Sequence, residues 1–524
     1  MRIVIDLQAC QTPGSRRRGI GRYSMALAQA MTRQAADKHE IWLALNGCFP
    51  DTIGDIREAF RPLLPPGRIA VFQTPRRPAG DPSAWRVQAA AIRELFLASL
   101  KPDIVHVSSL FEGLHDEATI AAGTPPTSVT IYDLIPFFNK DTYLKSEPVR
   151  AWYFDKIECL KSARLWLAIS GNVRAQAIGA LGLPEERVVK VASGFDECFV
   201  RQSVSPDREK QLRERLGLTR PFILYTSGID VRKNNERLVE AFAMLPERRN
   251  FQLAIVCSAT ETERRALLAH AASAGLGFDE FVMTGFVSDA DLVTLYNLCH
   301  LFVFPSLHEG FGLPALEAMA CGAPVIGSAV TSIPEVIGRD DALFDPTRTS
   351  DIAGAMAAVL GDEGFRQELR EHGIRQARIF SWDESARRVL AAFEQHGARM
   401  RDETGAATRH FLPGRTEWQV MIDITNLDLV TAGDAVKQLL GARQPGERLE
   451  AVFWDGHAFR YVTAATRRLL GLEEGGLAGE VAQAADGDSI VMLYGAEKLP
   501  MDARTALESF AKSGVDVCLP TGSA

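Results

Sequence analysis

The stretch LFVFPSLHEGFGLPALEAMACG, residues 301–322, decides the fold of this chain. Its beginning, LFVFPSL, is apolar and β-prone, which predicts a buried strand. Gly310 and Gly312 follow and would let the backbone approach a ligand closely. Pro314 suits the first position of a helix, so we expect a helix from Pro314 to Cys321. The stretch therefore predicts a strand, a glycine turn and a helix, a unit typical of α/β proteins.

Two glutamates, Glu309 and Glu317, stand on either side of this turn. The N–H groups and the positive dipole end of the predicted helix favour binding of an anion, and we expect that anion to be a diphosphate. Carboxylates repel phosphate, so we expect their partners to be hydroxyl groups, which donate hydrogen bonds. The turn therefore predicts a ligand that carries a ribose at one end of a diphosphate and a sugar at the other.

The chain resembles retaining glycosyltransferases of family 4, which have the GT-B fold. The resemblance covers roughly residues 1–396 and is densest from residue 220 onward. It rests on the stretch above and on further segments in the family's usual order: FILYTSGIDVRKNNERLVEAFAML (222–245), VMTGFVSDADLVTLYNLCHLFVFPS (282–306), CGAPVIGSAVTSIPEVIG (321–338) and FSWDESARRVLAAFE (380–394).

Short β-branched runs alternate with helical stretches along the chain, which is typical of doubly wound α/β proteins. We expect two Rossmann-like domains facing a cleft. The N-terminal, acceptor-side domain would cover residues 1–200, and the nucleotide-sugar-binding domain residues 201–396, with its last helix returning to the N-terminal domain. A polar linker over residues 397–416 and a small α/β extension over residues 417–524 would follow.

The extension opens with WQVMIDITNLDLV, a predicted strand ending in aspartate that echoes the opening RIVIDL. It resembles the start of a second glycosyltransferase module that stops before another HEGFG motif. A plain accessory α/β domain is the alternative. Asp486 and Asp488 form a DGD triplet like the metal motif of the other glycosyltransferase fold, but a turn is the simpler interpretation.

Length and composition exclude several classes of protein. The 524 residues predict roughly two to four domains, and no apolar run reaches the length of a membrane span. The opening MRIVIDLQACQTPG lacks a charged, apolar leader, so we expect a cytoplasmic protein. The eight cysteines form no CxxC pair, which favours reduced thiols over a zinc site. A net charge of −8 argues against a nucleic-acid partner.

Basic residues nevertheless crowd two loops of the first half. A solvated loop explains them, and so does contact with an anionic acceptor such as a lipid diphosphate, or peripheral contact with an anionic membrane surface. Both interpretations stay open. The residues are Arg16, Arg17, Arg18 and Arg22 in one loop and Arg76 and Arg77 in the other.

Arg232 and Lys233 follow the predicted strand FILYTS. Two cations there suit a diphosphate leaving group, because each charge-assisted hydrogen bond is worth roughly 1.5–3 kcal/mol. In the family an Arg and a Lys hold the pyrophosphate in place of a metal ion, and Lys233 fits the Lys, with a catalytic role. Gly228 stands where the Arg is usual, so we expect Arg232 to take over its task. The resemblance thus implies a site without metal or other cofactor.

The resemblance also assigns roles around the glycine turn. Glu309 would lie against the donor sugar as a catalytic residue, and Glu317 would accept hydrogen bonds from the ribose hydroxyls. Phe311, Gly312 and Leu313 would offer backbone N–H groups and a wall to the sugar and phosphate. For Glu317 alone, an ordinary carboxylate stabilised by the helix dipole is the alternative.

Asp133, in TIYDLIP, matches the point where the family carries His-Asp, and Tyr132 stands where the His is usual. Asp133 would orient an acceptor hydroxyl as a third catalytic residue. An aspartate that caps the loop is the alternative. Ser170 and Gly194 would line the cleft.

Gly19 and Gly21, in RRRGIGRYS, precede a helix predicted around Tyr23–Thr32. By resemblance, this glycine loop binds the donor by approaching its phosphate, and it also lies near the acceptor. GIGRYS suggests a dinucleotide fingerprint too, but the loop after RIVIDL is too long and Ser24 replaces the third glycine.

We therefore expect transfer of a hexose from a nucleotide diphosphate sugar to a glycan or lipid-linked acceptor, with retention of configuration. Family relatives favour GDP-mannose as the donor and bacterial surface polysaccharide synthesis, alongside partner glycosyltransferases, as the setting. The alternatives are a non-catalytic sugar-nucleotide scaffold, a nucleotide-sugar epimerase and a glycan phosphorylase, although the Schiff-base lysine motif of a phosphorylase is not visible.

Overall fold

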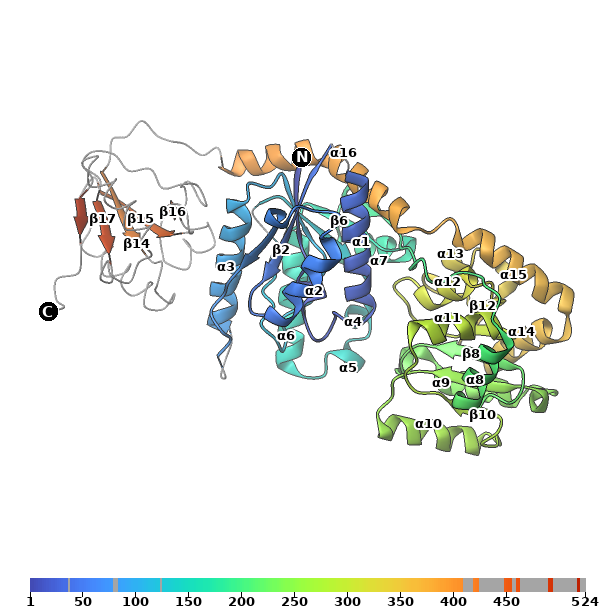
Figure 1. Cartoon of the computed structure of the whole chain (residues 1–524). Coiled ribbons are helices and arrows are strands. Elements are labelled where there is room, and N and C mark those ends of the chain that lie inside the picture. The colour runs from blue at the N-terminus through green and yellow to red at the C-terminus, as the bar shows by residue number, and fades with distance from the viewer. Residues whose placement is uncertain are drawn as a thin grey trace. The chain divides into compact units, whose positions relative to one another are not determined.

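Two compact units make up the chain, which a computed structural model describes at residues 1–35, 38–78, 83–122, 125–408, 418–423, 447–454, 459–461, 489–492 and 516–518. Unit 1 comprises Met1–Thr130, Glu147–Trp166 and Ala391–Ala524, and unit 2 comprises Ile131–Ser146 and Leu167–Leu390. The predicted α/β class is confirmed, because helices alternate with parallel strands throughout the first two sheets (Figure 1).

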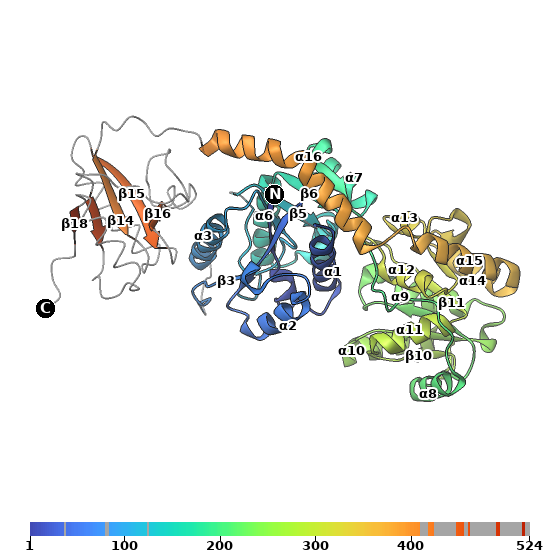
Figure 2. The ribbon, with the colours of Figure 1, turned by 45° about the horizontal axis from the view of Figure 1, so that its top comes forward.

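The first sheet has seven strands in the order β3-β2-β1-β4-β5-β6-β7. β1 pairs in parallel with both β2 and β4. The strands β2 and β3 are added on one side of β1, and β4 to β7 are added on its other side. Helices α1 and α3 lie on opposite sides of this sheet (Figures 1 and 2). The strands are β1 (Arg2–Asp6), β2 (Glu40–Asn46), β3 (Ile69–Phe72), β4 (Ile104–Val107), β5 (Thr127–Ile131), β6 (Leu165–Ala168) and β7 (Val188–Lys190).

The second sheet has six strands in the order β10-β9-β8-β11-β12-β13, and every neighbouring pair is parallel. β8, β9, β11 and β12 are buried along their whole length, which explains why their sequences are continuous apolar runs instead of alternating ones. The strands are β8 (Phe222–Thr226), β9 (Gln252–Val256), β10 (Phe281–Met283), β11 (Leu301–Phe304), β12 (Val325–Ser328) and β13 (Leu343–Phe344).

Helices cover the sheets, and local sequence sets several of their ends. Ser170 caps α7 by accepting a hydrogen bond from the Val173 N–H, and a Thr260–Glu263 capping box begins α10. In unit 2, α9 packs against α10 and α14, whereas α12 packs against α11 and α15. The helices are α1 (Gly19–Ala35), α2 (Pro50–Phe60), α3 (Ser83–Ser99), α4 (Ile135–Phe138), α5 (Lys140–Tyr143), α6 (Glu147–Ser162), α7 (Gly171–Leu181), α8 (Pro206–Leu216), α9 (Asn235–Ala243), α10 (Glu261–Ser273), α11 (Asp289–Leu298), α12 (Leu313–Ala320), α13 (Ile333–Ile337), α14 (Thr349–Gly361), α15 (Glu363–Ala377) and α16 (Trp382–Thr408).

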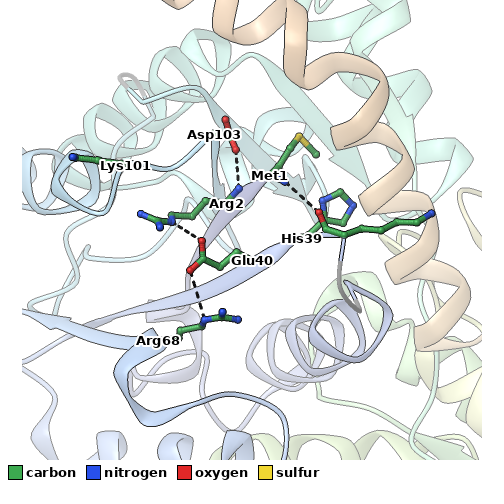
Figure 3. A pocket seen from close by; sticks show the side chains of 8 residues that line it. Met1, Arg2, His39, Glu40, Arg68, Lys101 and Asp103 are labelled. Atoms are coloured by element: carbon green, nitrogen blue, oxygen red, sulfur yellow. Dashed lines mark hydrogen bonds and ion pairs between the residues drawn. The ribbon is translucent and has the colours of Figure 1, made fainter.

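The amino ends of the first strands surround a hollow of about 720 Å³ (Figure 3). Arg2 makes three of the contacts in this hollow. Its Nε lies 2.9 Å from Glu40 Oε2, and its Nη1 donates a hydrogen bond to the Leu100 carbonyl. Its backbone N–H donates a hydrogen bond to the Asp103 carboxylate. Arg68 Nε lies 3.7 Å from the other Glu40 oxygen. These contacts join the starts of β1 and β2 to the loop before β4. The ion pairs are partly exposed, so each contributes about 0–1 kcal/mol.

His106 is a buried polar residue on β4. Its ring nitrogens lie 3.0 Å from Ser128 Oγ and 3.3 Å from Thr130 Oγ1, both on β5. Its ring centroid is 5.9 Å from that of Phe393 on α16. Burial lowers the pKa of His106 from 6.5 to about 3, so the imidazole is neutral at ordinary pH.

The carboxyl-terminal region differs in part from the organisation that we predicted for it. Residues 397–408, which we predicted to be linker, instead continue α16, because this segment contains no proline to end the helix. A third sheet has the order β16-β15-β14-β17-β18, with β14 parallel to β15 and β17. Asp486 and Asp488 lie outside the described residues. The strands are β14 (Trp418–Asp423), β15 (Glu447–Trp454), β16 (Phe459–Tyr461), β17 (Ser489–Met492) and β18 (Asp516–Cys518).

Among the described residues, none of the helices is both long enough and apolar enough to traverse a bilayer. The described cysteines whose side chains are placed are free thiols, and Cys10, Cys257, Cys299 and Cys321 are buried.

Candidate active site

The candidate site lies at the carboxyl ends of β8 and β11 in unit 2. These two strands are neighbours in the sheet, and the order of strands reverses between them. In open α/β sheets, ligands bind beyond the carboxyl ends of the strands at such a switch point. Lys233 comes from the loop after β8, and Glu309 comes from the loop after β11. The topology therefore brings together two residues that are 76 positions apart in the sequence.

An ion-paired cluster is the centre of this site. Lys233 Nζ lies 2.6 Å from Glu309 Oε1, and Arg232 Nη1 lies 3.1 Å from Glu309 Oε2. Lys233 and Glu309 are each only 8% exposed. A buried carboxylate is stable only when it is paired, and here two cations share it. The cations that we predicted would hold a diphosphate are thus paired with Glu309 in this structure.

Electrostatics keep Glu309 ionised. Burial alone would raise its pKa, but the positive charges of Lys233 and Arg232 and a hydrogen bond from Lys233 outweigh burial, so the pKa of Glu309 lies below its usual value. For Arg232, burial opposes the charged form, yet the nearby negative charges of Glu309, Asp133 and Asp230 leave its pKa above the usual value. Glu309 and Arg232 are therefore charged at neutral pH, whereas burial lowers the pKa of Lys233 and the negative charge of Glu309 opposes that change.

The loop after β8 is held in place by its own hydrogen bonds. Asp230 accepts a hydrogen bond from the Arg232 N–H, 3.0 Å away, and another from the Tyr143 hydroxyl, 2.6 Å away. Asn234 adopts a positive φ of 61°, and its side-chain amide donates to the carbonyls of Pro305 and Pro346. These contacts join the β8 loop to the segment after β11 and fix the point from which Lys233 projects.

The two loops also pair through their main chains. The Leu307 N–H donates to the Arg232 carbonyl at 2.7 Å, and Arg232 Nη1 donates to the His308 carbonyl at 3.2 Å. The His308 ring lies 6.4 Å from the ring of Phe138 on α4, and its Nε2 lies 3.2 Å from the Gln176 amide nitrogen. The motif HEGFG is thus held on both sides by residues distant in sequence.

Asp133 lies in the same unit and close to the cluster. Its carboxylate accepts a hydrogen bond from the Ile135 N–H at 2.9 Å, which is the capping role that we considered as an alternative. Burial raises the pKa of Asp133, while the charge of Arg232 opposes that rise. A Cβ added to Gly310 would lie 3.2 Å from Asp133 Cβ and 2.1 Å from the Tyr132 carbonyl oxygen. Gly310 is required because the main chain approaches so closely here.

Glu317 lies on α12, about one turn inside the helix as predicted, although α12 begins one residue earlier than the sequence indicated. The Tyr296 hydroxyl is 3.4 Å from Glu317 Oε2 and 2.8 Å from Thr226 Oγ1 at the end of β8. Tyr296 is fully buried, so its hydroxyl approaches Glu317 from the protein interior.

Gly312 and Phe311, which we also predicted to line the turn, differ in what they can offer a ligand. Gly312 has a φ of 119°, which favours glycine, and it precedes Leu313, the first residue of α12. Phe311 is 4% exposed, and its ring packs edge-to-face against Phe380 with centroids 5.6 Å apart. The Phe311 side chain is therefore part of the core, and only its backbone is left to contact a ligand.

Gly19 and Gly21 belong to unit 1, at the switch point between β1 and β4. A Cβ added to Gly21 would lie 2.4 Å from the Ser15 carbonyl oxygen, whereas Gly19 has open space around it. The buried carboxylate of Glu112, in the loop after β4, accepts hydrogen bonds from Thr12 and Ser15 at 2.8 and 2.7 Å. The loop that carries the glycines is therefore fixed from the neighbouring strand.

Ser170, Gly194 and Arg16, which we singled out in the sequence, each make a contact that explains why the residue is there. Ser170 is buried as the N-cap of α7, and a Cβ added to Gly194 would lie 2.3 Å from the Trp382 nitrogen, so both have structural explanations. In the basic loop, Arg16 pairs with Asp51 at 2.5 Å, whereas Arg17 and Arg18 are exposed.

Sequence reasoning missed several residues that shape the site, namely Tyr143, Asp230, Tyr296, His308 and Thr331. Asp230 and His308 stood inside motifs that were already singled out. No local pattern marks Tyr143 or Tyr296, because their proximity arises from the packing of distant segments.

Comparisons with known proteins agree with this geometry. The family model described as Glycosyltransferase Family 4 matches residues 17–197, and the model described as Glycosyl transferases group 1 matches residues 207–378. The chain belongs to glycosyltransferase family 4. The resemblance inferred from HEGFGLPALE and SGIDVRKN is thereby confirmed. The two matches cover β2 to β7 of the first sheet and all strands of the second sheet, including both loops of the ion-paired cluster.

Curated relatives of this family 4 chain include two proteins of Escherichia coli. The serotype-specific mannosyltransferase WbdA is 37% identical over 408 residues, which are 75% of this chain and 48% of WbdA. The O-antigen chain mannosyltransferase B is 28% identical over 377 residues, which are 72% of this chain and 96% of that protein. The chain spans about half the length of the WbdA proteins that it matches.

Solved structures confirm the GT-B fold expected for family 4. Sucrose-phosphate synthase from Thermosynechococcus elongatus has a TM-score of 0.57 and 19% identity, covering 76% of this chain and all of that one. HepE from Anabaena, in complex with UDP and glucose, has a TM-score of 0.55 and 18% identity, covering 75% of this chain and all of that one. At these identities the likeness concerns the fold alone.

Proposed function

We propose that the chain transfers a hexose, in particular mannose, from a nucleotide diphosphate sugar to a hydroxyl of a glycan acceptor, with retention of configuration. The observation that supports this most directly is the charged cluster of Lys233, Arg232 and Glu309 at the switch point of a family 4 domain. The names of the E. coli relatives support mannose as the transferred sugar, and GDP-mannose is the donor that we propose with it.

In this proposal the donor diphosphate competes with Glu309 for the cations. When the sugar–phosphate bond breaks, negative charge grows on the leaving phosphate, and Lys233 and Arg232 stabilise it electrostatically. Two side-chain cations would supply this charge without a metal ion. Glu309, released from the cations, would then face the donor sugar and stabilise the positive charge that develops on its anomeric carbon. Asp133 would hold the acceptor hydroxyl.

The proton of the acceptor hydroxyl would pass to an oxygen of the departing phosphate. The bond from the anomeric carbon to that phosphate breaks as the bond to the acceptor oxygen forms on the same face. No protein nucleophile is needed, so the transfer proceeds without a covalent glycosyl-enzyme. The Tyr296-supported carboxylate of Glu317 would meanwhile accept hydrogen bonds from the ribose hydroxyls.

Binding and transfer assays test this function together. Thermal shift with GDP-, UDP- and dTDP-sugars, with and without EDTA, should identify GDP-mannose as the donor that raises the melting temperature in both conditions. Incubation with that donor and a mannose-terminated glycan should then yield an α-linked product, detected by NMR. Binding without turnover would favour a scaffold, and conversion of the donor sugar alone would favour an epimerase. Loss of binding in EDTA would contradict the metal-independent site.

The acceptor in this proposal is a surface polysaccharide growing on a lipid carrier. The exposed Arg17 and Arg18 support contact with the carrier phosphate or with an anionic membrane surface from the cytoplasmic side. Flotation with vesicles that contain anionic lipid should recover the protein, and less of an Arg17→Ala/Arg18→Ala double variant. Equal recovery of both proteins would assign these arginines to the solvated loop.

The third sheet is proposed to be the start of a second glycosyltransferase module that works with the first. Like β1, β14 ends in an aspartate and lies between two parallel neighbours. Equal product length with the full chain and with a chain that lacks residues 417–524 would favour an accessory domain instead.

A further inference from the structure

Thr331 has an unusual backbone conformation next to the charged cluster. In the part of the chain that the structure describes, four non-glycine residues have a positive φ, namely Lys101, Ala192, Asn234 and Thr331. Thr331, at 55°, is the only β-branched residue among them. The left-handed region is strained for β-branched side chains, and such outliers persist where the surrounding structure enforces them. Glycine would fit this position without strain, so the threonine side chain must supply something that glycine lacks.

The threonine hydroxyl contacts the main chain of the predicted catalytic carboxylate. The Glu309 N–H donates a hydrogen bond to Thr331 Oγ1 at 3.2 Å. The adjacent residue, Ser332, is fully buried, and its single hydroxyl proton is shared between the Phe311 carbonyl at 2.7 Å and the Glu309 carbonyl at 3.0 Å. Two consecutive hydroxyls thus hold Glu309 by both of its backbone groups.

Glu309 needs such an anchor because of its neighbours in the sequence. Gly310 follows it directly, and Gly312 has a φ of 119°, so the segment that carries Glu309 has little intrinsic stiffness. The Glu309 carboxylate nevertheless has a defined place, 2.6 Å from Lys233 in this structure, and the proposed mechanism needs it beside the donor sugar. Small shifts of a reacting group are costly, since a displacement of about 1 Å can slow catalysis about a hundredfold.

We propose that Thr331 is a positioning residue: its strained conformation aims its hydroxyl at the Glu309 N–H and so holds the Glu309 main chain at the point from which the carboxylate can reach the donor sugar. This inference rests on the proposed function. Asn234 offers a comparison within the same site: it too has a positive φ, and its side-chain amide is fully used in holding two carbonyls. In both residues the side chain makes hydrogen bonds that glycine could not make.

Three variants of the full chain separate positioning from stability. Thr331→Gly removes both the strain and the hydroxyl, so its melting temperature should equal or exceed that of the wild type while kcat falls about tenfold or more. Thr331→Ser keeps the hydroxyl and should retain most of the wild-type kcat. Lys101→Gly relieves the same kind of strain in unit 1, outside the predicted site, and should leave kcat unchanged.

Hydrogen exchange measured by mass spectrometry provides a readout that does not need activity. The peptide that contains Glu309 should exchange faster in Thr331→Gly than in the wild type, and Thr331→Ser should restore slow exchange. Wild-type kcat and wild-type exchange in Thr331→Gly would overturn the inference. If the wild-type protein itself shows no transfer with any donor, the proposed function fails, and the exchange data still decide whether Thr331 anchors Glu309.

Discussion

Glu309 pairs with two cations, Lys233 and Arg232, where little solvent reaches them. The cations can therefore bind another anion only if it displaces the Glu309 carboxylate. A diphosphate that enters the site must separate the carboxylate from Lys233 and Arg232. The exchange of one anion for another keeps the cations paired, and the released Glu309 carboxylate would accept hydrogen bonds from hydroxyls of the donor sugar instead.

Removal of the Lys233 ammonium tests this charge balance. In Lys233→Ala, Arg232 still pairs with Glu309, so the fold should persist, but the leaving phosphate loses a stabilising charge. We expect kcat to fall about a hundredfold or more. Steady-state kinetics would measure the effect, with the exposed Lys210→Ala on α8 as the matched control. A wild-type rate in Lys233→Ala would contradict its role.

Glu317 should act on donor affinity and not on the chemical step. Replacement by Gln keeps the shape but weakens the hydrogen bonds that ribose hydroxyls donate, so Kd for the nucleotide should rise about tenfold. Calorimetric titration of Glu317→Gln with the nucleotide would measure this. The exposed Glu214→Gln on α8 serves as its control. An unchanged Kd would favour the alternative of a carboxylate that only stabilises the helix.

At the residue scale, the sequence located the chemistry that lies in continuous motifs. Glu309, Lys233 and Arg232 could be predicted because a strand, a glycine turn and a helix leave a local signature. Their mutual pairing could not, because it depends on β8 and β11 being neighbours. Thr331 could not be predicted for another reason. Its distinguishing feature is a positive φ, and a threonine in a loop gives no sign of that backbone angle in the sequence.

Individual strands and helices were more predictable than their ends. The runs RIVIDL, FILYTS and LFVFPS all became parallel strands, since buried parallel strands are apolar throughout. The helix predicted around residues 23–32 extends over Gly19–Ala35. Its start was missed because the glycines there indicated a loop.

The turn between β11 and α12 depends on one glycine. In Gly310→Ala the new Cβ would overlap the Tyr132 carbonyl oxygen, and backbone on both sides resists movement. We expect the free energy of unfolding to fall by about 1–3 kcal/mol. Urea denaturation would measure it. Gly354→Ala on α14, where nothing lies within 4 Å, should be neutral or stabilising. Equal stability of Gly310→Ala and the wild type would show that the turn can open.

The β4–β5 pair carries a titratable group, His106, that is neutral in the folded state. Its folded pKa of about 3 lies below the ordinary 6.5, so between these values the unfolded chain binds more protons. Stability should therefore fall as the pH falls through this window, by about 1.4 kcal/mol at pH 5.5 from this residue alone. Denaturation of the wild type and His106→Gln at pH 7.5 and 5.5 would test this. Parallel losses in the two proteins would contradict it.

At the scale of the whole molecule, all residues of the charged cluster belong to unit 2, whereas the glycine loop belongs to unit 1. Each unit has its own buried core. We therefore expect two transitions in scanning calorimetry, of which a bound nucleotide sugar at about 100 times its Kd should raise one by about 5–10 °C. A shift of both transitions together would mean that the two units unfold as one.

The edges of the two large sheets have a consequence for handling the protein. β10 and β13 end one sheet with three and two residues, and β3 and β7 end the other with four and three. Strands this short present few unpaired main-chain groups, so a second molecule finds little on which to add a strand. Folded chains at high concentration should resist aggregation through strand addition at these four edges, even though both sheets are strongly apolar inside.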